Sequence, residues 1–344
     1  MPLLARIEQA LERSLERSTS PSGPPRLQQA IRHAVIPGGA RIRPQLCLAV
    51  ALACGDDDPQ LADAMASALE LMHCASLVHD DLPCFDNADL RRGLPSVHRA
   101  YGERLAVLAG DALIVMAFRE LGVAAGRHPE RLATIMAWLD AGVGPPDGIV
   151  AGQAWECEPS AKLDQYQRAK TGALFSAATA GGAAAAGADG RDWFALGANL
   201  GEAYQVADDI RDVISDPALL GKPVGQDLLL GRPSAARELG LEGAVEHFDQ
   251  LIRGAIRSIP PCPGEALLRS LVLSEARRLV PSEGPASIPR PMVDGSVAPL
   301  GAIPALAPAS VSGSISSPTS APGSGVRTHD GRRAHPAGAP ATPR

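Results

Sequence analysis

Apolar residues recur every three to four positions along most of the chain up to about Val280, the spacing of helices that bury one face. The clearest such segments run over 61–82, 104–126 and 192–214. Strictly alternating runs bounded by hairpin turns, which indicate strands, do not occur in this part of the sequence. Breaks rich in proline and glycine separate the segments at 20–25, 36–39, 144–146 and 260–264. The pattern predicts an all-α domain.

The pattern changes after about Pro281, where proline, alanine, serine and glycine dominate and the helical spacing ends. A segment of this composition cannot bury enough apolar surface to offset the entropy lost on ordering. We therefore predict a folded domain over 1–283 and a disordered tail over 284–344.

Composition supports helices and excludes some partners. Of all residues 45% are hydrophobic but only 3% aromatic, and alanine and leucine, the best helix formers, dominate. The net charge of −6 argues against a nucleic-acid partner. The six cysteines are scattered without a C-x-x-C pair, as is typical of reduced cytoplasmic thiols. The longest apolar run, 172–187, is too rich in alanine and glycine for a membrane span. We expect a cytoplasmic protein without membrane spans.

Two groups of aspartates carry the candidate chemistry, and the second is the simpler one. Asp208 and Asp212 are four residues apart and share a helix face, with Asp209 beside them. Three like charges on one turn repel each other, a cost that divalent cations would relieve. Mg²⁺ typically joins one or two carboxylates to substrate phosphates. A solvated acidic helix face is the alternative interpretation.

The first group follows an apolar helix. His73 and Asp80 lie two turns apart on one side of that helix, whereas Asp86 falls off this face and Pro83 interrupts the helix before it. The pattern leaves the position of Asp86 open. Arg91 and Arg92 follow at once, and guanidinium groups suit diphosphate oxygens. A surface patch of salt bridges remains the alternative.

Further basic residues stand at anion-binding positions. Only three lysines occur, and two of them, Lys170 and Lys222, lie in short motifs with glycine. A lysine ammonium approaches phosphate as a point charge, unlike the planar arginine group. The segment 38–44 places two glycines before Arg41 and Arg43 at a predicted helix start, a plausible anion site. Each feature alone also fits a surface cation or a turn, but their joint occurrence with two acidic groups favours a phosphate site.

Together these segments resemble the trans-isoprenyl diphosphate synthases, the farnesyl and geranylgeranyl diphosphate synthase family. The resemblance spans about 24–280 and includes, in the family's order, G-G-x-R-x-R-P at 38–44, D-D-x-x-x-x-D at 80–86 followed by R-R-G, G-D-A-L at 110–113, G-Q at 152–153, K-T-G at 170–172, Y-Q-x-x-D-D-x-x-D at 204–212 and G-K-x-x-G-x-D at 221–227. The first aspartate motif is similar to the bacterial and plastid type. The resemblance implies an all-helical isoprenoid-synthase bundle around a deep central cavity, usually as a homodimer.

The resemblance also implies site roles. The metal ligands of a cluster of three Mg²⁺ ions would be Asp80, Asp86 and Asp208, with support from Asp81, Asp209 and Asp212. The allylic diphosphate would be held by Arg91, Lys170, Lys222 and Arg232, and the diphosphate of isopentenyl diphosphate by Arg43, His73 and Arg92. Carbonyl dipoles near Lys170 and Thr171, and the side chain of Gln205, would stabilise the allylic cation. One position departs from the family pattern, because Ala40 stands where a lysine is usual.

Product length would depend on the residues just before Asp80, which line the pocket for the growing chain in this family. Ala75 and Ser76 are both small, so we expect a C20 product, geranylgeranyl diphosphate, for carotenoid or (bacterio)chlorophyll side chains. The alternatives are a farnesyl diphosphate synthase and a regulatory subunit of a heteromeric synthase, although such a subunit would be expected to lose an aspartate motif. A cyclising terpene synthase would not need the second diphosphate site.

Overall fold

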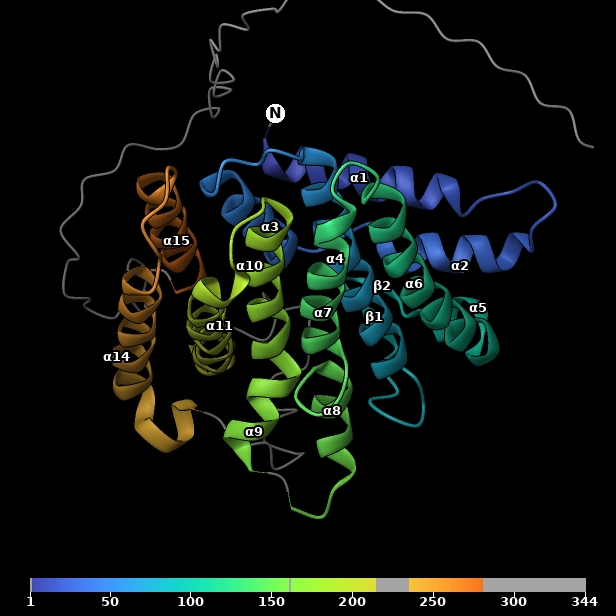
Figure 1. Ribbon diagram of the computed structural model, residues 1–344. Coiled ribbons are helices and arrows are strands. Elements are labelled where there is room, and N and C mark those ends of the chain that lie inside the picture. The colour runs from blue at the N-terminus through green and yellow to red at the C-terminus, as the bar shows by residue number, and fades with distance from the viewer. Residues whose placement is uncertain (1, 161, 215–234, 281–344) are drawn as a thin grey trace, which may run out of the picture. The chain divides into compact units, whose positions relative to one another are not determined.

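The computed structural model describes residues 2–160, 162–214 and 235–280, which belong to one compact unit. These residues form helices almost throughout, which confirms the all-α prediction (Figure 1). The long helices are α1 (Leu3–Arg17), α2 (Pro25–Val35), α3 (Ile42–Ala53), α4 (Pro59–Asp80), α6 (Glu103–Ala124), α7 (Pro129–Val143), α10 (Ala173–Ala185), α11 (Phe194–Ile214), α14 (Ala235–Arg257) and α15 (Glu265–Leu279). The predicted tail, 284–344, lies outside the described residues.

Helix α4 is the central element of the core. Its start is fixed by Asp58, whose side chain accepts hydrogen bonds from the backbone N–H groups of Gln60 and Leu61, and by Pro59 at the first helical position. Most of its side chains are buried, and it packs against α6, α3 and α10. Its length and apolarity would suit a membrane span, but 78% of its most apolar window is buried inside the protein. Asp80 is therefore the last residue of a helix that is mostly buried in the core.

Helix α10 explains the run rich in alanine and glycine. A Cβ atom at Gly182 would lie 2.3 Å from the carbonyl oxygen of Cys47 in α3, so only glycine permits this approach. All but the first residue of α10 are buried. The segment is a core helix whose small residues allow close packing against α3, α7 and α11.

A short hairpin follows α4 that the sequence pattern did not predict. Strands β1 (Leu90–Arg91) and β2 (Leu94–Pro95) pair antiparallel, and the two residues between them, Arg92 and Gly93, both have positive φ. Two consecutive residues of positive φ form the turn that suits a two-residue hairpin loop. Strands of two residues are too short to produce an alternating pattern, which is why the hairpin could not be recognised from the order of apolar and polar residues.

The remaining elements of the described residues are short. They are α5 (Val97–Tyr101), α8 (Ile149–Ala154), the 3-10 turns η1 (Trp155–Cys157) and η3 (Gly190–Trp193), α9 (Leu163–Gln167) and the π-helical turn η2 (Arg168–Gly172). A π-helical turn is rare and frequently marks a functional site. Here it contains Lys170 and Thr171.

Candidate active site

The loop after α4 settles the position of Asp86. The backbone N–H of Asp86 donates to the carbonyl oxygen of Asp80 at 3.0 Å, and that of Ala88 donates to the carbonyl oxygen of Asp81 at 3.2 Å. The chain therefore folds back over the end of the helix instead of continuing along it. Asp86 reaches Asp80 through this loop and not through a shared helix face.

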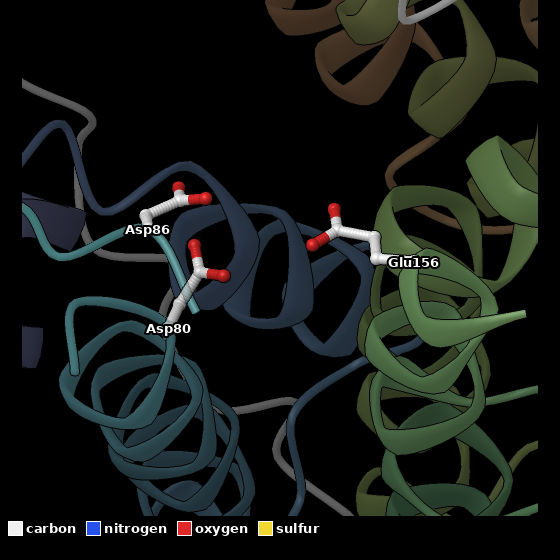
Figure 2. A group of neighbouring side chains, drawn as sticks. All are labelled: Asp80, Asp86 and Glu156. Carbon is white, nitrogen blue, oxygen red and sulfur yellow. The ribbon is translucent and has the colours of Figure 1, made fainter. Parts of the chain in front are cut away.

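Three carboxylates meet at this point. Asp80, Asp86 and Glu156 each offer one oxygen within 4.8 Å of the others, and Figure 2 shows them converging from α4, its loop and η1. Asp80 is 9% exposed, and its Oδ1 atom is buried without a hydrogen-bond partner. A set of carboxylate oxygens with a buried, unsatisfied member fits a hard divalent cation such as Mg²⁺.

The electrostatics of Asp80 agree with this fit. Burial raises the pKa of Asp80 above its usual range, and the charges of Asp86 and Glu156 add to the rise. Lys170 opposes the rise, with its Nζ atom 3.6 Å from Asp80 Oδ1. When its three carboxylates are ionised, the cluster therefore carries more negative charge than the nearby cations neutralise.

Glu156 was missed by the sequence analysis. Its Oε1 atom accepts hydrogen bonds from the Tyr166 hydroxyl at 2.6 Å and from Lys170 Nζ at 2.5 Å, and its Oε2 atom accepts one from Gln153 at 3.0 Å. The only signal in the sequence was its place three residues after Gln153 in the G-Q motif. The glycine of that motif also has a clear role, because a Cβ atom at Gly152 would lie 2.4 Å from Lys170 Cα.

A chain of hydrogen bonds runs from the π-helical turn to the second aspartate group. The Thr171 hydroxyl donates to Gln205 Oε1 at 3.1 Å, and Gln205 Nε2 donates to Asp209 Oδ1 at 3.2 Å. Asp209 is buried, and its Oδ2 atom accepts from the backbone N–H of Ala235 at 2.8 Å. Asp209 therefore ties α11 to the start of α14.

The other two members of the second group lie differently. Asp208 is 40% exposed at its side chain and pairs with Arg211 one turn along α11. Asp212 belongs to α11, but its side chain lies outside the described residues. Within the described part of the chain, the group of converging carboxylates includes Asp80 and Asp86 but neither Asp208 nor Asp209.

Arg91 links the hairpin to the end of α4. Its Nε atom donates to Asp81 Oδ1 at 2.9 Å, its Nη2 atom also bonds Asp81, and Nη2 lies 3.9 Å from Asp80. Asp81 is only 2% exposed. The carboxylate of Asp81 thus orients Arg91 toward the acidic group.

A second cationic group lies at α3. Arg43 Nη1 is 3.5 Å from His73 Nε2, its guanidinium stacks 4.8 Å from the Phe175 ring centroid, and its buried Nε atom has no hydrogen-bond partner. Burial, followed by the charges of Arg43 and Arg92, holds the pKa of His73 well below its usual value. A neutral histidine and a buried, unsatisfied guanidinium form a site that an anion would complete.

Arg92 and Arg41 differ in how fully other residues engage their guanidinium groups. Arg92 packs against Gly39, where a Cβ atom would lie 3.0 Å from its Nε atom, and Nη2 is 3.9 Å from Glu70. Arg41 is 2% exposed, and its guanidinium is taken up by Glu8, Glu70 and the carbonyl oxygen of Val35. Arg41 is therefore a structural residue, whereas the side chain of Arg92 is 24% exposed.

The remaining predicted residues are either small or undescribed. Ala75 in α4 is 2% exposed, and Ser76 beside it donates its hydroxyl to the carbonyl oxygen of His73 at 2.8 Å. Lys222 and Arg232 lie outside the described residues. The structure thus brings Lys170 and Arg91 to the acidic group and places Arg43 beside His73. Arg92 lies near enough for its charge to lower the pKa of His73.

Comparison with known proteins identifies close relatives. The sequence matches the polyprenyl synthetase family over residues 24–262. A geranylgeranyl diphosphate synthase of Cereibacter sphaeroides is 55% identical over 278 residues, which cover 81% of this chain and 96% of that protein. A second, from Rhodobacter capsulatus, is 51% identical over 280 residues, with coverage of 81% and 97%. The solved structure of a Helicobacter pylori geranyltransferase, complexed with magnesium and isoprenyl diphosphate, is 31% identical with a TM-score of 0.67, covering 81% and 98% of the two chains.

Proposed function

The chain belongs to the polyprenyl synthetase family and is a prenyltransferase, and from this premise we propose that it makes geranylgeranyl diphosphate. It would join isopentenyl diphosphate to an allylic diphosphate, head to tail. The observation that carries the proposal is the pairing of an acidic group at Asp80 with two separate cationic positions, one at Lys170 and Arg91 and one at Arg43 and His73. Two diphosphates require two such positions.

The chemistry follows from these positions. Lys170 and Arg91, together with Lys222 and Arg232, would hold the allylic diphosphate while its C–O bond breaks and the electron pair leaves with the diphosphate. The double bond of isopentenyl diphosphate, held by Arg43, His73 and Arg92, then attacks the allylic cation. Loss of a proton to the released diphosphate forms the new double bond.

Two polar side chains, Thr171 and Gln205, would stabilise the allylic cation. The Thr171 hydroxyl and the Gln205 amide are fixed by their mutual hydrogen bond, so their dipoles need no reorganisation during the reaction. The carbonyls of the π-helical turn are a further source of negative dipole ends.

We propose three magnesium ions per active site, held by Asp80, Asp86 and Asp208 with support from Asp81, Asp209 and Asp212. The buried, unsatisfied oxygen of Asp80 supports a metal at the first group. When bound, Mg²⁺ would offset the negative charge that develops on the leaving diphosphate.

Product chromatography tests the proposed function directly. The full-length protein would be incubated with labelled isopentenyl diphosphate and, in turn, dimethylallyl, geranyl and farnesyl diphosphate. We expect a C20 product from each primer. Recovery of C15 without C20 would identify a farnesyl diphosphate synthase, and the absence of any product would favour a regulatory subunit.

Ala40 should weaken binding of isopentenyl diphosphate, because the usual lysine is missing and Arg41 is fully engaged with Glu8 and Glu70. We expect Ala40→Lys to lower the KM for isopentenyl diphosphate by about tenfold or more, the value of one charge-assisted hydrogen bond. The matched variant Ala40→Met supplies length without charge and should leave this KM unchanged. Equal KM values in Ala40→Lys and the wild type would refute the prediction.

We further propose a homodimer formed through α6. Val107, Leu108, Val115 and Phe118 are 42%, 50%, 67% and 38% exposed and follow one face of this helix. Apolar patches of this kind commonly mark interfaces, and symmetric dimers are the commonest assembly. Light scattering should show a dimer that Val115→Arg converts to a monomer. Leu239→Arg on α14, 52% exposed, is the control and should remain dimeric. A monomeric wild type would contradict this.

We place the enzyme in the cytoplasm, where its product would supply carotenoid or (bacterio)chlorophyll side chains. Support for the location comes from the six cysteines, all of which are free thiols. Pigment analysis after deletion of the gene would test the pathway, and unchanged pigment would exclude it.

A further inference from the structure

Glu156 is a member of the acidic group that also forms a hydrogen bond with the neighbouring lysine. Its side chain is 19% exposed, and that of Lys170 is 22% exposed. Donors that converge on its carboxylate include Gln153 at the end of α8, Tyr166 in α9 and Lys170 in the π-helical turn. The Lys170 ammonium also lies 5.6 Å from the centroid of the Tyr166 ring. Glu156 and Tyr166 thus hold the Lys170 side chain in place, on the side of the site opposite α4.

The lysine is shared unequally between two carboxylates. Its Nζ atom is 2.5 Å from Glu156 Oε1 but 3.6 Å from Asp80 Oδ1, and this Asp80 atom is left without a hydrogen bond. Coulombic attraction strengthens as charges approach, and strengthens further where water is excluded. Without Glu156, the nearest partner for the ammonium would therefore be the buried Asp80, at the position where a metal ion is expected.

We propose that Glu156 is a positioning residue that keeps the Lys170 ammonium from moving into hydrogen-bonding distance of Asp80 Oδ1, so that this oxygen stays open to the metal. This inference rests on the proposed function, because it assigns Asp80 and Lys170 to the metal and diphosphate site. Glu156 acts through Lys170 and need not bind the metal. The same contact holds Lys170 where it can reach a diphosphate.

Mn²⁺ binding to the substrate-free enzyme, followed by electron paramagnetic resonance, separates this role from direct ligation. We expect Glu156→Ala to weaken Mn²⁺ binding by about tenfold, a coupling typical of charged residues in contact. In a Lys170→Ala background the same substitution should have less than about a twofold effect, because no ammonium remains to occupy Asp80. Glu158→Ala, an exposed carboxylate two residues along, is the matched control and should bind Mn²⁺ as the wild type does.

Two results would overturn the inference. If Glu156→Ala weakened Mn²⁺ binding equally with and without Lys170, Glu156 would be a direct metal ligand. If it left Mn²⁺ binding unchanged in the wild-type background, Glu156 would have no influence on the metal position. Circular dichroism of each variant would verify the fold.

The steady-state kinetics provide a second readout. Glu156→Ala should raise the KM for the allylic diphosphate several-fold and leave that for isopentenyl diphosphate unchanged, because only the former would contact Lys170. Equal effects on both KM values would count against the inference. A wild-type enzyme that made C20 product but bound no Mn²⁺ without substrate would overturn the inference and leave the proposed function standing.

Discussion

Asp80→Asn is expected to lower kcat by about a thousandfold, equivalent to about 4 kcal/mol of transition-state stabilisation. Asp80 is the buried member of the acidic group, and its Oδ1 atom is unsatisfied. Asparagine has nearly the same shape but no charge, so it would hold a divalent cation poorly. The diphosphate would then leave without an adequate counter-charge. Single-turnover measurements with geranyl diphosphate at saturating Mg²⁺ would report the loss.

The same substitution should not destabilise the fold. Burial raises the pKa of Asp80, so the ionised carboxylate lowers stability at neutral pH, above both its folded and unfolded pKa values, and this penalty disappears as the pH falls below the unfolded value. An uncharged amide at this position would remove the penalty, and the melting temperature in EDTA should be unchanged or slightly higher. Asp89→Asn is the matched control, since Asp89 lies in the same loop, is 72% exposed and pairs with Arg99. A kcat for Asp80→Asn within tenfold of the wild type would contradict the proposed metal site.

Part of this site could be predicted from the sequence, and part could not. Helix periodicity found α4, α6 and α11 because each buries a continuous apolar face, and the breaks between them carry proline or glycine. Asp80 could be placed for the same reason, since it continues the face of α4 that carries His73. Asp86 could not, because its approach to Asp80 depends on backbone hydrogen bonds in an irregular loop.

Three further features depend on tertiary contacts that leave no mark in the local pattern. Glu156 meets Lys170 only because α8 and the π-helical turn pack against each other at Gly152. Arg41 stands in the same motif as Arg43, yet Glu8 and Glu70, from α1 and α4, make it structural. One partner of Asp209, the N–H of Ala235, is twenty-six residues away. Motif membership therefore indicated the neighbourhood of these residues but not the direction of their side chains.

Ala75→Tyr is expected to change the main product from C20 to C15 or shorter. Position 75 precedes Asp80 by five residues, which is about 7.5 Å along α4 at the helical rise. An extended isoprene unit spans about 5 Å for bonds of about 1.5 Å, so position 75 lies between one and two isoprene units from Asp80. The metal ions and the diphosphate would separate the start of the hydrocarbon chain from Asp80, which leaves room for the first units before position 75. A bulky ring there would block further growth, while the first condensations could still occur.

The control for this change must keep the side chain small and so leave the pocket open. Ser76→Ala preserves volume and should still give C20, whereas Ser76→Phe adds volume one residue closer to Asp80 and should also shorten the product. The second large variant matters because Ala75 is 2% exposed, and overpacking a buried position commonly costs about 1–3 kcal/mol of stability. Chromatography of the products from dimethylallyl diphosphate would decide between the outcomes. If both folded large variants still gave mainly C20, the growing chain would not follow this face of α4, and residues on another helix would set its length.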